Sequence, residues 1–110
     1  MKALRHLARA ALRASRPLYR PRTPTPGELA HIRSQMGLQV LDCERGAARR
    51  ARAQLEASAS AQQLWLLRSE IFQVVTHRFG QSEAERRVAT LTPLFDGLLP
   101  RANRQPPAPR

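Results

Sequence analysis

The sequence has few of the residues that build a large core or a covalently cross-linked one. Aromatic residues make up 5% of the 110 residues, and there is one cysteine, Cys43. A single cysteine excludes an internal disulfide, so the fold needs no oxidising compartment. Cys43 is expected to serve as a small buried or half-buried apolar residue, with a reactive thiol as the less favoured alternative. A chain of this length forms one domain at most, and its core has to be built mainly from leucine, valine, isoleucine and alanine.

Long apolar runs and clusters of reactive side chains are also missing. No stretch approaches the ~20 apolar residues that a membrane-spanning helix needs, and arginines interrupt the N-terminal segment where a secretory signal is continuously apolar. His6, His31 and His77 stand apart from other ligand-type residues, and neither a glycine-rich phosphate loop nor a nucleophile elbow is present. The sequence predicts a protein that is not an enzyme and needs no metal or cofactor.

Lysine is almost absent, since Lys2 is the only one, whereas arginine is abundant. Lysine and arginine together number 19 against 8 acidic residues, which gives a formal net charge of +11. Such a charge favours polyanionic partners, namely nucleic acid, anionic lipid or an acidic protein face. Because arginine, alanine, proline and glycine all have GC-rich codons, base composition is an alternative source of part of this charge.

The segment before Glu28 contains no acid, and its basic residues follow a helical pattern. At about 100° per residue, one sector about 80° wide holds the side chains of Lys2, Arg5, Arg9, Arg13 and Arg16. Leucines and alanines occupy the opposite side, and Pro17 ends the pattern. The sequence predicts a cationic amphipathic helix over residues 1–16 that binds an anionic surface.

Two functions fit such a helix, and an ordinary surface helix packed on the core is the third alternative. Organellar targeting peptides are amphipathic, arginine-rich and free of acids. A permanent arm that binds an anionic membrane or another polyanion has the same pattern. Leu18-Tyr19-Arg20 resembles the signature of the LYR-motif mitochondrial assembly factors. In that family the motif lies within a continuing helix, whereas Pro17 and Pro21 flank it here, so nothing is carried over from the resemblance.

The rest of the chain is predicted to contain a proline-rich linker over residues 17–25, a helical domain over 26–99 and a disordered basic tail over 100–110. Thr25, Pro26 and Glu28 form a helix start signal, and Gly37 is the expected end of that helix. The apolar stretch from Leu38 to Leu41 has no assignment. Asp42 is the predicted N-cap of one long helix that runs to about Arg78.

The second half of this long helix, residues 64–79, is apolar on most sides and is predicted to be the centre of the fold. Its aromatic residues recur at seven-residue spacing, namely Trp65, Phe72 and Phe79. Gly80 is expected to close it, and a capping box of Ser82 and Glu85 to open a helix that folds back antiparallel. That helix has Val88, Leu91, Phe95 and Leu98 on one face, with an interruption at Pro93. The predicted fold class is all-α, a small helical hairpin or bundle.

A second basic cluster follows Asp42 and consists of Arg45, Arg49, Arg50 and Arg52. Arg49 follows Arg45 on one helical face, so the cluster is a candidate phosphate-contacting patch, with a solvated helix face as the alternative. Residues 26–39 faintly resemble the first helix of a helix-turn-helix repressor, but no recognition helix follows.

The sequence therefore predicts a non-enzymatic helical accessory or assembly factor that binds a protein partner and is targeted to mitochondria or to an anionic surface. We expect a mitochondrial location in a eukaryotic cell and a cytoplasmic one in a bacterium. The alternative is a basic nucleic-acid-binding accessory protein of bacterial, plasmid or phage type. It would use the N-terminal arginines and the patch on Arg45, Arg49, Arg50 and Arg52.

Overall fold

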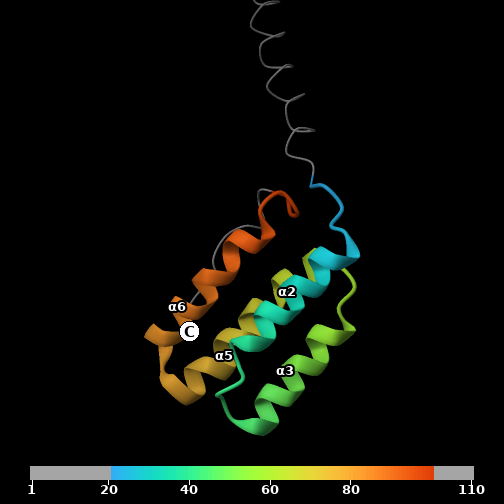
Figure 1. Cartoon of the computed structure of the whole chain (residues 1–110). Coiled ribbons are helices and arrows are strands. Elements are labelled where there is room, and N and C mark those ends of the chain that lie inside the picture. Colours follow the sequence, from blue (N-terminus) through green and yellow to red (C-terminus); the bar gives the residue numbers. More distant parts are fainter. Residues whose placement is uncertain (1–20, 101–110) are drawn as a thin grey trace, which may run out of the picture.

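The computed structural model describes residues 21–100, and all regular structure in that range is helical (Figure 1). The elements are α2 (Pro26–Leu38), α3 (Arg45–Ala57), α4 (Ala61–Leu66), α5 (Arg68–Phe79), α6 (Gln81–Leu91) and the 3₁₀ turn η2 (Thr92–Phe95). Helices α2 and α3 run antiparallel, as do α5 and α6, and the two pairs pack together. The all-α class is confirmed. The predicted helix over 1–16, the first part of the linker and residues 101–110 lie outside the described residues.

Helix α2 begins where the sequence predicts. Thr25 Oγ1 accepts a hydrogen bond from the Glu28 amide at 3.0 Å, and the Glu28 carboxylate accepts one from the Thr25 amide at 2.9 Å. The Arg22 guanidinium donates to both oxygens of the same carboxylate, at 2.8 and 2.6 Å. The Arg22 amide also donates to the Gly97 carbonyl oxygen at 2.9 Å. The end of the predicted linker is thus attached both to α2 and to the segment after η2.

The turn between α2 and α3 corrects two expectations. Gly37 does not end α2, which continues to Leu38, because Gly37 does not adopt the left-handed conformation found at Gly80 and Gly97. Glu44 caps α3 in place of Asp42. Its carboxylate accepts hydrogen bonds from the Gly46 amide at 2.8 Å and from the Ala47 amide at 2.7 Å. Asp42 binds a side chain of α6 instead.

Three helices replace the single long helix predicted from Asp42 to Arg78. The chain becomes extended at Ser58, and Ser60 then caps α4, accepting a hydrogen bond from the Gln63 amide at 3.1 Å. The Gln63 side chain accepts one in return from the Ala59 amide at 2.6 Å, a variant of the capping box. A second interruption falls at Leu67, between α4 and α5.

The turn between α5 and α6 is confirmed, but its predicted cap is wrong. Gly80 closes α5 with a φ of 98°, a left-handed conformation that favours glycine. Because α6 begins at once with Gln81, Ser82 and Glu85 lie inside the helix and no side chain caps it. The predicted apolar face is buried, with Val88, Leu91, Phe95 and Leu98 all in the core. Pro93 lies in η2, as the interruption of the helix predicts.

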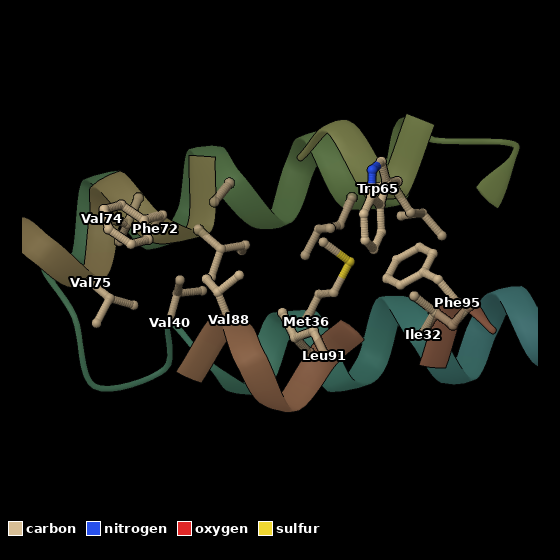
Figure 2. Close-up of a cluster of buried hydrophobic side chains, with 14 of the residues drawn as sticks. Ile32, Met36, Val40, Trp65, Phe72, Val74, Val75, Val88, Leu91 and Phe95 are labelled. Carbon is tan, nitrogen blue, oxygen red and sulfur yellow. The ribbon is translucent and has the colours of Figure 1, made fainter. Parts of the chain in front are cut away.

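The core lies between the helices and is mainly aliphatic (Figure 2). The rings of Trp65 and Phe95 meet edge to face, with centroids 5.0 Å apart and planes at 71°. Helices α4 and α5 contribute Leu64, Trp65, Ile71, Phe72, Val74 and Val75. The predicted central segment is therefore buried on one side, whereas Leu66 is 63% exposed and contradicts the prediction that the segment is apolar and covered on most sides. Phe79 departs from the predicted aromatic stripe, since 41% of it is exposed.

Arg87 connects α6 to the turn between α2 and α3. Its guanidinium donates to both Asp42 carboxylate oxygens at 2.8 and 3.0 Å, to Glu83 at 2.7 Å and to the Gln39 carbonyl oxygen at 2.8 Å. Hydrogen bonds from Arg87 hold the pKa of Asp42 below its usual range. Those from Arg86 and Arg87 together lower the pKa of Glu83 to about 2. The cluster therefore joins segments that are far apart in the sequence.

Candidate docking groove between α2 and α3

The excess positive charge of the chain lies outside the helical domain. Residues 21–100 contain ten arginines and eight acidic residues, a net charge of +2. Residues 1–20 contribute six basic residues and residues 101–110 three, with no acid in either segment. The helical domain is nearly neutral, so a binding surface on it depends on the local arrangement of its charges.

Two adjoining hollows follow α3, and we refer to them together as the α2–α3 groove. The first has a volume of about 370 Å³ and lies between α2 and α3, with Arg33 and Leu38 on its α2 side. The second, of about 560 Å³, continues between α3 and the turn that precedes it. Leu41, Arg52 and Glu56 border both hollows, which makes the groove continuous.

Small residues on both helices create this groove. Helix α3 contributes the short side chains of Ala48 and Ala53 to the second hollow, where longer side chains would fill the space. On α2, Gly37 has no side chain. A Cβ atom there would lie 4.0 Å from both Arg52 Nε and Leu55 Cδ1, so the glycine leaves room along the wall of the groove.

The groove exposes two large apolar side chains. Leu38 is 50% exposed and Leu41 is 57% exposed, whereas Val40 between them is fully buried. Single exposed leucines are ordinary on a protein surface, but apolar side chains gathered at a hollow are typical of binding sites. Phe79, by contrast, is partly covered by the guanidinium groups of Arg87 and Arg78, at 4.7 and 5.3 Å from its ring centre.

The structure divides the basic patch that the sequence predicts. Arg45, Arg49 and Arg52 line the groove together with Glu56, because residues spaced by three and four share one helical face. Arg50 does not border either hollow. It lies near Glu44, whose pKa is lowered first by hydrogen bonds from the Gly46 and Ala47 amides and to a smaller extent by the charge of Arg50.

No residue between 21 and 100 occupies the guanidinium groups of the three groove arginines, so these groups are available to a partner. Within that range, Arg45, Arg49 and Arg52 take part in no ion pair or hydrogen bond. Most of the other arginines between residues 21 and 100 are engaged, and Arg33 is an example at the groove itself. It donates two hydrogen bonds, of 3.3 and 2.8 Å, to the Ser58 carbonyl oxygen, which ties the end of α3 to α2.

Arg68 is a buried cation that does not border the groove. It is 5% exposed, and its guanidinium carbon lies 3.3 Å from the centre of the Trp65 ring. Burial lowers its pKa to about 10, so it stays charged at neutral pH. Its Nε donates to the Trp65 carbonyl oxygen at 3.1 Å, which points to a role in packing α4 against α5.

Cys43 borders the second hollow and is half-buried. Burial raises the pKa of its thiol, and the carboxylate of Asp42 raises it further. A protonated thiol is a poor nucleophile and a poor metal ligand. The structure therefore favours the small apolar role expected from the sequence.

Other predicted features fall outside the groove or outside the described range. Lys2, Arg5, Arg9, Arg13 and Arg16, the predicted anionic-surface residues, lie beyond the described residues. Between residues 21 and 100, no three potential metal ligands lie close enough together to hold an ion. None of the helices described is both long enough and apolar enough to cross a membrane.

Comparisons of the chain with protein-family models, with curated protein sequences and with solved structures find no match. The function proposed below depends on the groove and on the distribution of charge along the chain.

Proposed function

We propose that the chain is a non-enzymatic helical accessory or assembly factor. It binds a protein partner through the α2–α3 groove, and its basic N-terminal segment directs it to mitochondria or to another anionic surface. The observation that best supports partner binding is the groove itself. It combines the exposed leucines Leu38 and Leu41 with three arginines that form no ion pair within the described range.

The two ends of the described domain lie close together, and this supports a role for the basic segments that is separate from partner binding at the groove. The bond between the Arg22 amide and the Gly97 carbonyl oxygen brings the start and the end of the described domain together (Figure 1). The turn that carries Leu41 lies at the other end of α2. An anionic surface that attracts the basic ends would thus leave the far part of the groove accessible to a partner.

A reporter protein fused to residues 1–27 tests the targeting part of the proposal. In a eukaryotic cell we expect the fusion to concentrate in mitochondria, because import favours acid-free, arginine-rich amphipathic segments. A matched fusion with Arg5, Arg9 and Arg13 replaced by glutamine keeps the length and the apolar residues, and should remain in the cytosol. A diffuse signal from the unaltered fusion would contradict mitochondrial targeting.

A nucleic-acid-binding accessory protein is the second candidate, and the arginine stripe of α3 is the observation that favours it. Binding of this kind would weaken steeply with salt, since each phosphate contact releases counterions. Two features of the groove make it the weaker candidate. The exposed leucines offer little to a phosphate backbone, and the Glu56 carboxylate repels one.

A further inference from the structure

We infer that the α2–α3 groove receives an amphipathic α-helix of the partner, with an apolar strip flanked by acidic residues. This inference rests on the proposed function and specifies the chemistry of its partner. Helix-in-groove recognition places the apolar side chains of one helix against an apolar trough of another protein. The groove meets that requirement through Leu38 and Leu41.

The charges of α3 set the expected pattern of acids on the partner. Arg45, Arg49 and Arg52 follow each other at spacings of four and three residues along one face. From Arg45 to Glu56 the helix rises about 16 Å, or three turns, at 1.5 Å per residue. A partner helix lying along α3 would match the arginines with carboxylates at the same spacings. Opposite Glu56, one turn further on, it would carry a basic residue.

The apolar contacts lie beside this stripe. Leu41 borders both hollows and Leu38 borders the first, where Arg52 and Leu55 form the opposite wall. The volumes of about 370 and 560 Å³ fall in the range of about 300–1,000 Å³ that is usual for binding sites. Each hollow can therefore accept apolar side chains of a helix whose acids meet the arginines.

Charge excludes the obvious occupants from the chain itself. Residues 1–20 and 101–110 are basic and contain no acid, so the groove arginines repel both. In residues 21–100 of a second copy, Glu28, Asp42 and Glu83 are paired with arginines of their own chain, and Glu44 caps α3. The other four carboxylates lie on four different segments, so no helix in this range presents free acids at the spacings of the groove arginines. An acidic helix of a different protein remains the occupant that the charges favour.

Fluorescence anisotropy with two synthetic helical peptides tests the inference on the full chain. One probe carries leucines on one face with glutamates at spacings of four and three residues, and the other replaces those glutamates by arginine. We expect the acidic probe to bind, and its affinity to fall about tenfold or more when Arg49 and Arg52 are both changed to glutamate. The arginine probe should prefer this double variant.

Arg50→Glu is the matched control, since it makes the same charge change on the same helix outside the groove. Acidic-probe affinity should stay near that of the unaltered chain in this variant. Failure of the acidic probe to bind, or an equal loss in Arg50→Glu, would overturn the inference. So would duplex DNA or anionic phosphatidylglycerol vesicles that bind in the groove in place of the peptide. If the acidic probe fails to bind but a protein partner from cells is lost from the double variant, the inference is wrong and the proposed function stands.

Discussion

Replacing Phe95 by alanine is expected to lower the free energy of unfolding by about 3–5 kcal/mol, the usual effect of emptying a buried aromatic site. Phe95 is 1% exposed and packs edge to face on Trp65 at a centroid distance of 5.0 Å. In Figure 2 the side chain of Met36, which is also fully buried, points toward these two rings. The neighbours of this site are themselves buried core residues, so a cavity left by the ring would be filled only in part. Since small domains are stable by only about 5–15 kcal/mol, Phe95→Ala should remove much of the stability.

Phe79→Ala provides the control for this variant, with the same side chain removed from a site that is 41% exposed. The Phe79 ring contacts arginines at the surface rather than the core, so its loss should cost far less. Chemical denaturation followed by circular dichroism measures both effects. Equal losses of stability in the two variants would show that the assignment of the core is wrong.

Replacing Arg87 by methionine is expected to cost about 2 kcal/mol, since hydrogen bonds to charged groups contribute about 1.5–3 kcal/mol. The Arg87 side chain is 13% exposed and contacts Asp42, Glu83 and the Gln39 carbonyl oxygen together. Methionine retains most of the apolar stem but none of the donors. The variant should therefore loosen α6 from the turn between α2 and α3.

Arg86→Met is the matched control on the neighbouring residue. Arg86 also pairs with Glu83, at 2.6 Å, but its side chain is 65% exposed, and ion pairs in solvent contribute little. We expect its unfolding midpoint to stay close to that of the unaltered chain. The difference between Arg87→Met and the unaltered chain should also shrink in acid. The pKa of Glu83 is lowered to about 2 in the folded chain, whereas the pKa of a glutamate in the unfolded chain is about 4.3. The pairing of Arg87 with Glu83 therefore contributes its full stabilisation above a pH of about 4.3, and this stabilisation is lost as the pH falls through about 2. Equal midpoints for the two variants would contradict the bridging role of Arg87.

Local signals were sufficient to predict the fold class and several helix ends. The start of α2 depends on Thr25 and Glu28, which are neighbours in the sequence, and the turn at Gly80 depends on one glycine. The break before α4 has a local signal as well, in the Ser60 and Gln63 pair. This signal is easily missed, because alanine, arginine and glutamine, which favour helix, are frequent on both sides of the break.

Other features depend on contacts between distant residues and could not be predicted from patterns. Asp42 has the composition of an N-cap, but it binds Arg87, which lies 45 residues further along the chain. Phe79 continues a seven-residue repeat, but α5 ends there and the ring lies at the surface. Periodicity predicts on which face of a helix a residue lies. It does not predict whether a neighbouring helix extends far enough to cover that face.

The candidate site shows the same division. The four-residue spacing of Arg45 and Arg49 was a correct guide to one face, and Arg52 continues it, whereas Arg50 belongs to another face. Leu38 and Leu41 carried no recognisable signal. The groove that they border is lined by Gly37 on α2 and by Ala48 and Ala53 on α3, and no sequence pattern shows that these small residues border the same groove.

Co-purification from the chain's own cells tests partner binding at the groove most directly. The full chain would be tagged and compared with Arg49→Glu/Arg52→Glu and with Arg50→Glu, after circular dichroism has shown that all three are folded. We predict that one protein partner co-purifies in stoichiometric amount with the unaltered chain and with Arg50→Glu, and is lost from the double variant. Recovery of that partner equally with all three chains, or recovery of nucleic acid with no protein partner, would contradict the account.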